Sequence, residues 1–429
     1  MLFLYRIISP GNKIVSNKKL FVIWTSHSYR SLKTFGHEEL ALQHDSGGWF
    51  DFVYTLYPVL GAHPIDKEIS FKGPIRFTYL SPKHLYIEAK LASLPFLKYV
   101  NLCNTILSQV FVLFSSARII RKENVSIIRA NDPFITGVYA YILSRMTGRP
   151  FGLRVGANYD LLFKSGTMIG KKIFKFYFIQ KIIARFVFSR AEFIMAATQD
   201  YLNYALNNGA PHNCSVVTRF GNFIDSVHLH PSSMKTDVRS LFALEKRPFG
   251  IYVGRLTKVK HADDLVLIAK EIKQLHPEAA LVLIGDGDLM EAMKEQAKNL
   301  NVSENIFFLG KQKQEIIASL LPYSVAYLAT HSGRSLVEAA FSGIPLIAYD
   351  FEWHSEIVKN GLTGELVGYR NYRAMAVSFC RMLENPDVQR KLGRQARKLA
   401  FQLMDPEAVR AIEHDVYAKV FSDACGNKT

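Results

Sequence analysis

The sequence contains little cysteine and no paired-cysteine motif. Among its 429 residues there are four cysteines, which lie far apart and have no CxxC or Cys/His partner: Cys103, Cys214, Cys380 and Cys425. This spacing argues against a disulfide framework and a structural zinc site, and it suits a reducing compartment. The first residues, Met1 to Arg6, have no charged leader and no small-residue cleavage site, so we do not expect a signal peptide.

Long uncharged apolar runs are also scarce. The best candidate for a membrane span is the run Tyr99–Ala117. Its polar residues Asn101, Asn104, Ser108 and Ser115 recur at helical spacing, so that they share one face. This pattern favours an amphipathic helix over a span, and we expect no transmembrane helix.

Acidic residues are few in one half of the chain. The whole chain has a formal net charge of +16. Residues 1–225 carry 27 Lys and Arg against 13 Asp and Glu, a net of +14, whereas residues 226–429 carry 26 against 24, a net of +2. A basic half indicates an anionic partner, which could be a membrane surface, a phosphorylated substrate or nucleic acid. The alternative is a bias toward solubility with no partner.

Short apolar runs alternate with helical patterns along nearly the whole chain. This alternation predicts an α/β fold with two doubly wound domains, each large enough to bury its own core. We place the seam in Gly221–Gly250 and a last helix at Pro406–Phe421. The expected strands are Leu20–Thr25, Val53–Leu56, Arg76–Leu80, Val125–Arg129, Gly152–Val155, Phe193–Ala197, Gly250–Val253, Ala280–Ile284, Asn305–Leu309, Val325–Leu328 and Pro345–Ala348.

Three loops of the second half follow predicted strands directly. In the first, Gly254–Lys260, Arg255 and Lys260 could converge on a diphosphate at the carboxyl end of a strand; the alternative is two solvated cations. In the second, Ile284–Asp288, Gly285 and Gly287 would let backbone approach a ligand or a neighbouring loop closely.

The third loop runs from Thr330 to Ala340. Gly333, Arg334 and Ser335 lie where a strand gives way to a helix, and free backbone N–H groups there favour phosphate. Glu338 lies further into that helix, where it could accept hydrogen bonds from sugar hydroxyls, although a surface helix often carries a glutamate.

Taken together, the order and spacing of these loops resemble the retaining GT-B glycosyltransferases of family 4. The resemblance is dense from Gly250 to Val367, where a Gly-Ile-Pro-Leu-Ile-Ala strand and a Glu356–Val367 tail follow the three loops. It is thinner in the first half, where Val217–Asp225 is similar to the family's hinge and Ile128–Pro133 to its strand and helix before the acceptor loop.

The resemblance implies two Rossmann-like domains facing across a cleft. Residues 1–225 would bind the acceptor, residues 226–405 would bind a nucleotide-sugar donor, and helix 406–421 would cross back. Arg255 and Lys260 match the residues that stabilise the departing diphosphate. The donor site would also include Gly254, Gly285, Gly287, Gly333, Arg334, Ser335 and Glu338. We expect no metal and no cofactor, because cations supply the positive charge and no DxD motif is present.

The sequence departs from the family pattern at several positions. Thr330 stands where the first Glu of the Glu-x7-Glu pair belongs, and His331 and His261 stand where glycine is usual. The glycine-rich loop after the first strand is missing. His27 and Asp160 are the candidate acceptor-site residues, although a loop histidine is more often structural or solvated.

The predicted function is retaining transfer of a sugar to a saccharide or lipid-linked acceptor in cell-surface polysaccharide synthesis. The alternatives are a nucleotide-sugar epimerase of the same fold and a non-catalytic GT-B-like scaffold. The stretch Lys164–Arg190 reads as a basic amphipathic helix with Lys171, Lys175, Lys181 and Arg185 near one side. It suits an anionic membrane surface, or else packs its aromatics on the sheet. We expect a cytoplasmic protein on the inner face of the membrane, with no nucleic-acid partner.

Overall fold

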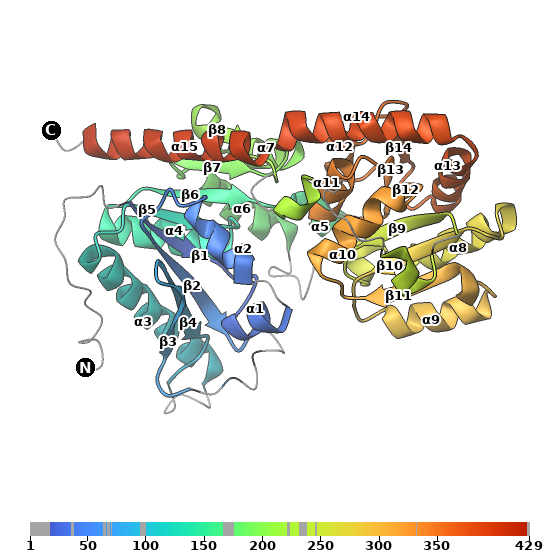
Figure 1. Ribbon diagram of the computed structural model, residues 1–429. Coiled ribbons are helices and arrows are strands. Elements are labelled where there is room, and N and C mark those ends of the chain that lie inside the picture. The colour runs from blue at the N-terminus through green and yellow to red at the C-terminus, as the bar shows by residue number, and fades with distance from the viewer. Residues whose placement is uncertain are drawn as a thin grey trace. The chain divides into compact units, whose positions relative to one another are not determined.

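The computed structural model describes most of the chain. The described residues are 18–35, 38–62, 66, 69, 71–94, 100–165, 176–220, 224–230, 238–244, 247–331 and 333–426. Met1–Arg6, Lys171, Lys175 and parts of the predicted seam lie outside them. Strands and helices alternate around two separate sheets, as the sequence predicts (Figure 1).

The first sheet has eight strands in the order β3-β4-β2-β1-β5-β6-β7-β8. Its strands are β1 (Lys19–Ile23), β2 (Phe52–Leu60), β3 (Ile75–Ser81), β4 (His84–Lys90), β5 (Ile127–Ala130), β6 (Phe151–Val155), β7 (Phe193–Ala196) and β8 (Ser215–Val217). The helices between them are α1 (Tyr29–Phe35), α2 (Glu38–Leu42), α3 (Asn101–Lys122), α4 (Ile135–Thr147), α5 (Tyr159–Ser165), α6 (Tyr177–Phe188) and α7 (Gln199–Asn207).

One part of this sheet differs from the expected parallel arrangement. The edge strand β3 is partly exposed and pairs with β4 in antiparallel fashion. The sequence analysis missed β4, because a glutamate interrupts its apolar pattern. Glu88 is nonetheless fully buried, since it forms an ion pair with Arg76 and accepts a hydrogen bond from the backbone N–H of Tyr29 at 2.9 Å.

The second sheet has six strands in the order β11-β10-β9-β12-β13-β14, and every described pair is parallel. Its strands are β9 (Phe249–Val253), β10 (Ala280–Ile284), β11 (Ile306–Gly310), β12 (Ala326–Ala329), β13 (Leu346–Tyr349) and β14 (Gly364–Val367). Its helices are α8 (Asp264–Leu275), α9 (Met290–Asn299), α10 (Gln314–Leu320), α11 (Arg334–Phe341), α12 (His354–Ile357), α13 (Tyr372–Glu384) and α14 (Pro386–Met404).

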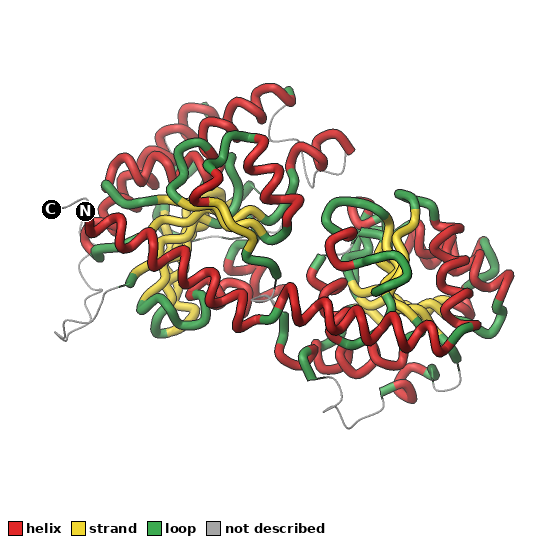
Figure 2. Tube along the Cα trace, turned by 90° about the horizontal axis from the view of Figure 1, so that it is seen from above, coloured by secondary structure: helices red, strands yellow, loops and turns green. Residues whose placement is uncertain are grey.

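Burial explains why these segments form strands. Alternate residues of β9, β10, β12 and β13 pack with α8, α9 and α13 in one apolar core, in which Tyr252, Leu283 and Phe379 are almost completely buried. Seen from above, helices flank the strands of each sheet (Figure 2). Buried strands of this kind carry continuous Val, Ile and Leu runs rather than alternation, which is why the sequence revealed them.

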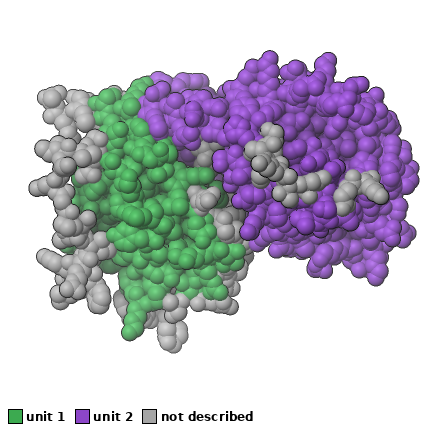
Figure 3. Space-filling model, viewed as in Figure 1, with its two compact units in different colours: residues 1–153, 191–193, 417–429 green, residues 154–190, 194–416 purple. Residues whose placement is uncertain are grey.

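Contacts divide the chain into two compact units (Figure 3). The first comprises residues 1–153, 191–193 and 417–429, and the second comprises residues 154–190 and 194–416. The expected boundary at residues 225/226 stays a prediction. The last helix, α15 (Pro406–Gly426), contributes residues to both units.

The end of α15 completes the core of the first unit. Tyr417 is fully buried among the rings of Trp49, Phe50 and Phe193, at centroid distances of 4.8–5.7 Å. Its hydroxyl bonds the buried guanidinium of Arg129 on β5 at 2.7 Å. A side chain near the C-terminus therefore satisfies a buried charged group in the first sheet.

The close approach of α14 to the turn before β13 generates a stability prediction. A Cβ at Gly393 would lie 2.1 Å from the carbonyl oxygen of Gly343, so Gly393→Ala forces backbone to move. We expect a loss of about 1–3 kcal/mol in the free energy of unfolding, measured by urea denaturation. Gly156→Ala is the control, because its Cβ would meet nothing within 4 Å and it should change stability by less than about 0.5 kcal/mol. Equal stability of the two variants would contradict this packing.

Candidate functional site

The three predicted loops lie at one edge of the second sheet. From β9 the chain moves outward to β10 and β11, and then crosses to β12, β13 and β14 on the other side. The order of strands therefore reverses between β9 and β12. In open parallel sheets, ligands bind outside the carboxyl ends of the strands at such a switch point. The loop after β9 and the loop after β12 are the two that border it.

The glycines after β10 serve the packing of neighbouring loops. The N–H of Gly254 donates to the carbonyl of Ile284 at 2.9 Å, and the N–H of Leu256 donates to that of Asp286 at 3.0 Å. A Cβ at Gly285 would lie 1.9 Å from the carbonyl oxygen of Gly254, and one at Gly287 would lie 2.1 Å from that of Leu256. The sequence allowed a close approach to either a ligand or a neighbouring loop. In the structure, Gly285 and Gly287 lie close to the backbone of the loop after β9.

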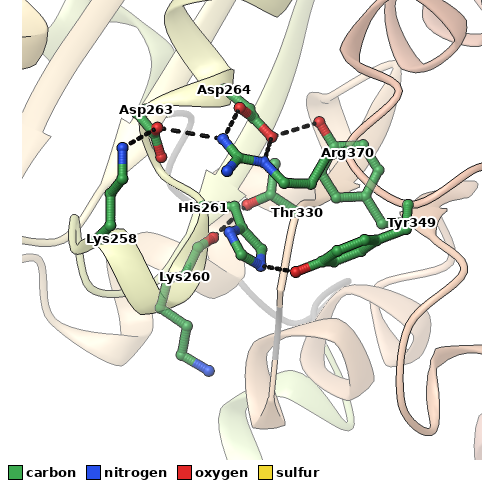
Figure 4. A network of polar contacts seen from close by, with 9 residues as sticks. Lys258, Lys260, His261, Asp263, Asp264, Thr330, Tyr349 and Arg370 are labelled. Atoms are coloured by element: carbon green, nitrogen blue, oxygen red, sulfur yellow. Dashed lines mark hydrogen bonds and ion pairs between the residues drawn. The ribbon is translucent and has the colours of Figure 1, made fainter. Parts of the chain in front are cut away.

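The loop after β9 presents two lysines in different directions. Lys258 is exposed and forms an ion pair with Asp263 at 2.8 Å. The ammonium of Lys260 points away from that carboxylate network (Figure 4). No hydrogen bond or ion pair joins the Lys260 ammonium to any residue in the described part of the chain. Burial, with a smaller effect from Arg255, lowers its pKa to about 8. A desolvated cation beside a second cation is an arrangement that favours an anion.

A polar network behind this loop fixes its backbone. Arg370 pairs with Asp264 at 2.5 Å and with Asp263 at 3.2 Å, and the Tyr349 hydroxyl donates to Asp264 at 3.0 Å (Figure 4). His261 follows Lys260 with a φ of +50°. This conformation suits glycine, which is the residue that the resemblance described above implies at this position.

The ring of His261 compensates for its unfavourable backbone. It is buried and hydrogen-bonds the Tyr369 hydroxyl at 2.9 Å. Burial, with a smaller effect from Arg370, lowers the pKa of His261 to about 4, so the ring is neutral at pH 7. The departure from glycine therefore has a local structural explanation.

The loop after β12 is tied to the lysine loop. The hydroxyl of Thr330 donates to the carbonyl of Lys260 at 2.8 Å, and Nδ1 of His331 donates to the carbonyl of Val259 at 2.7 Å. Thr330 is fully buried, so its hydroxyl is committed to this contact. The two residues that depart from the family pattern thus connect the loops on both sides of the switch point.

The start of α11 holds the other predicted donor residues. A Cβ at Gly333 would meet open space, and the Ser335 hydroxyl accepts a hydrogen bond from Tyr327 at 2.8 Å. Arg334 forms an ion pair with Glu338 at 2.9 Å. The Arg334 side chain is therefore paired with the carboxylate that the sequence predicts to bind a sugar hydroxyl.

Glu338 is buried and has a second neighbour. Nε2 of His228 lies 3.9 Å from its carboxylate and bonds Gln314 at 2.8 Å. His228 is itself fully buried. The sequence analysis did not identify His228 as part of this group, because it lies more than 100 residues before Glu338 in a segment without a motif.

Glu352 is a further site residue that sequence reasoning missed. It follows β13 with a φ of +50°, accepts a hydrogen bond from the Tyr201 hydroxyl at 3.2 Å, and lies 3.4 Å from Nε2 of His331. Burial alone would raise its pKa, but the His331 contact and the nearby Lys260 charge lower the pKa of Glu352 below its usual value. Glu352 therefore supplies an ionised carboxylate near the loop that contains Lys260. Thr330, which stands at the position where a glutamate was expected, supplies none.

The two acceptor candidates have partners within their own units. Nδ1 of His27 lies 3.1 Å from the Ser31 hydroxyl, and its ring lies 5.3 Å from that of Trp24. Asp160 forms an ion pair with Lys181 at 2.7 Å and accepts a hydrogen bond from Asn208 at 3.1 Å. Their roles toward an acceptor stay predictions.

Comparisons with known proteins show which proteins this chain resembles. Residues 233–399 match the family model described as "Glycosyl transferases group 1". The chain is 24% identical over 312 residues to N-acetyl-alpha-D-glucosaminyl L-malate synthase of Bacillus anthracis, covering 72% of this chain and 78% of that protein. It is 28% identical over 171 residues to glycogen synthase of Mycobacterium tuberculosis, covering 39% of this chain and 41% of that protein.

Solved structures share the fold. The sucrose-phosphate synthase of Thermosynechococcus elongatus has a TM-score of 0.72 at 15% identity, covering 95% of this chain and 100% of that one. The Anabaena protein HepE, solved in complex with UDP, has a TM-score of 0.69 at 16% identity, covering 94% of this chain and 100% of that one. The fold is GT-B with two Rossmann-like domains, as the sequence predicts. With the family match, these likenesses support a glycosyltransferase.

The state of Lys260 generates a pH-dependent prediction. Its folded-state pKa of about 8 lies below the ordinary value of 10.5, so the protonated side chain destabilises the folded protein below pH 8. We expect Lys260→Met to raise the free energy of unfolding at pH 7 by about 1–3 kcal/mol, measured by urea denaturation. The gain should shrink as the pH rises from 8 to 10.5, because the wild-type lysine then loses its proton.

Lys258→Met is the matched control on the same loop. Lys258 is exposed, and its ion pair with Asp263 lies at the surface. Such pairs contribute about 0–1 kcal/mol, so this variant should be neutral or slightly less stable at every pH. A Lys260→Met protein that is less stable than wild type at pH 7 would show that Lys260 is not strained in the free protein.

Proposed function

We propose that this protein is a retaining glycosyltransferase that uses a nucleotide-sugar donor. The observation that carries the proposal is the cationic pair at the switch point of the second sheet, where Lys260 and Arg255 lie together without a hydrogen-bonded carboxylate on the lysine. Glycosyl transfer breaks the bond between the sugar and the diphosphate, so negative charge grows on the departing phosphate. Cations that are already fixed there stabilise that charge in the transition state.

We further propose that the reaction needs neither a metal nor a cofactor. A divalent ion in phosphate chemistry neutralises charge on the leaving group. Arg255 and Lys260 supply two positive charges for the same purpose, and the backbone N–H groups in the first turn of α11, where Gly333 provides no side-chain cap, add hydrogen-bond donors. Gly333 leaves open space beside those N–H groups, which suits the close approach of a phosphate.

The acceptor is proposed to be a saccharide or a lipid-linked saccharide in polysaccharide synthesis. The net charge of +14 on residues 1–225 favours an anionic membrane surface next to the acceptor. On α6, the aromatic residues Phe178 and Phe186 are exposed, beside the exposed cation Arg185. Of the two alternatives for this helix, the exposed Phe178 and Phe186 favour the membrane surface, whereas Phe188 is buried against Tyr204. We propose a peripheral protein on the cytoplasmic face.

The departure at Thr330 does not remove the basis for catalysis. Thr330 holds the Lys260 loop, and Glu352 places a carboxylate in the same neighbourhood. A non-catalytic scaffold has no need for a strained cation. Two measurements distinguish a glycosyltransferase from the scaffold and epimerase alternatives.

The first test compares two lysines of one loop. UDP and UDP-glucose are the first probes, because they occupy a solved structural neighbour, and a panel of other nucleotide-sugars follows. We expect a donor to raise the melting temperature of the wild-type protein, with the shift retained in EDTA. Lys260→Ala should lower the rate of nucleotide release at least about 100-fold, whereas Lys258→Ala should change it less than about threefold. Absence of a shift and of release with every donor would contradict transfer.

The second test concerns stereochemistry. With an α-linked donor that passes the first test, a retaining enzyme gives an α-linked product, and the anomeric proton coupling in NMR distinguishes it from the β-linked one. A β-linked product would contradict the retaining mechanism while leaving the donor site intact. Conversion of the donor sugar to its epimer, without transfer, would favour the epimerase.

A further inference from the structure

In the first half of helix α3, polar side chains face the protein and apolar side chains face outward, whereas Val112, Ala117 and Ile120 further along are buried. Asn104 is 6% exposed and Ser108 is fully buried, whereas Leu102 is 72% exposed and Phe114 is 64% exposed. In a helix at the surface of a soluble domain, the apolar stripe normally faces the core. The sequence predicts an amphipathic helix here, and in the structure the first half of that helix turns its polar face inward.

The inward polar face is bound to the first sheet. Both polar atoms of the Asn104 side chain bond the backbone of Leu94, at 2.9 and 3.0 Å. The Ser108 hydroxyl accepts from the N–H of Ser93 at 2.8 Å, and the Gln109 amide donates to the carbonyl of Leu91 at 3.0 Å. These bonds satisfy backbone groups beyond the end of β4, so the helix cannot rotate its polar face toward water without leaving them unpaired.

The outward face is continuous and carries no acid. Its exposed apolar side chains recur over three turns and comprise Leu102, Ile106, Leu107, Val110, Phe111 and Phe114. The same face continues into Arg118, Arg121 and Lys122, all exposed. By length and composition alone, Leu102–Lys122 is long and apolar enough to cross a membrane. An exposed apolar surface of this extent marks an interaction site.

We propose that the outward face of α3 lies in the interface of an anionic lipid bilayer. The inference deepens the proposed membrane-side acceptor and rests on it. The apolar side chains would enter the boundary between headgroups and acyl chains, and the cations at the end of the helix would contact anionic headgroups. The helix lies in the interface rather than across the bilayer, because its polar face is bound to the backbone of Ser93 and Leu94, which follow β4.

Charge favours a bilayer over a protein partner. The exposed stripe ends in three cations, within a half of the chain that has a net charge of +14. The acid that follows the helix, Glu123, is paired with Lys19 at 3.4 Å, so it does not offset these charges. An anionic bilayer matches both parts of this face, because its acyl chains suit the apolar side chains and its headgroups suit the cations.

The test is sedimentation of the full chain with vesicles. One set contains phosphatidylcholine with phosphatidylglycerol, and the other contains phosphatidylcholine alone. We expect binding to the anionic set and at least a tenfold loss of binding in Phe111→Gln/Phe114→Gln. We expect Arg118→Gln/Lys122→Gln to weaken binding and to reduce its dependence on salt. Glutamine is a good helix former without charge, so repulsion does not produce the effect.

The matched control removes two exposed apolar side chains elsewhere. Val377→Gln/Val388→Gln changes α13 and α14, where both valines are about half exposed. It should bind vesicles as the wild type does. Vesicle binding that is absent in the wild type, or unchanged in Phe111→Gln/Phe114→Gln, would overturn the proposal. A wild-type dimer in light scattering that this variant dissociates, without vesicle binding, would assign the face to a second copy.

Donor binding separates this inference from the proposed function. Phe111→Gln/Phe114→Gln should keep the melting-temperature shift with nucleotide-sugar, because α3 lies in the first unit and the cationic loop in the second. Retained shift with lost vesicle binding supports the docking surface. If the wild type binds vesicles but shows no melting-temperature shift with any donor, the proposed transfer fails. Loss of vesicle binding in Phe111→Gln/Phe114→Gln would then still assign docking to α3.

Discussion

A cation held away from its natural partners is the constraint around which the second unit is organised. Lys258, Arg370 and Arg334 form ion pairs with carboxylates, whereas Lys260 forms none in the described part of the chain and is subject to repulsion by Arg255 and a smaller attraction by Glu352. Holding it requires the hydrogen bonds from Thr330 and His331 to the loop backbone and the network around Asp264. Burial of Lys260 therefore costs stability, and perturbed cations of this kind are candidates for binding an anion.

Much of the fold could be predicted because buried parallel strands leave a strong local signal. Leu281, Leu283 and Ile284 are apolar in sequence for the same reason that they are buried in the sheet. The strand β4 was not predicted because it carries Glu88 in its centre. The charge of Glu88 is balanced by Arg76, and the two residues lie opposite each other only once β3 has paired with β4. Antiparallel pairing of β3 left no trace in the apolar pattern for the same reason.

The candidate site was predictable where backbone geometry dictates residue type. Glycines at 285 and 287 are required by a carbonyl less than 2.2 Å from where a Cβ would stand, and such constraints leave a motif. Glu352, His228 and the orientation of α3 left none. Periodicity shows that Asn104 and Ser108 share a face of α3, but whether that face turns inward depends on backbone groups at Ser93 and Leu94 that need partners. Hydrogen-bond demand of this kind cannot be read from the helix itself.

The contact between Arg129 and Tyr417 has a consequence for synthesis of the chain. Arg129 is buried in the middle of the first sheet, and its hydroxyl partner lies 288 residues later. While the ribosome is still making the second unit, the first sheet is present without that partner, and the apolar surface around Trp49 and Phe50 lacks its cover. Domains that are contiguous in sequence can finish folding in the order in which they are made. Here the part that is made first is completed last, so a premature stop just before Tyr417 leaves the second unit complete and the first unit without this buried side chain.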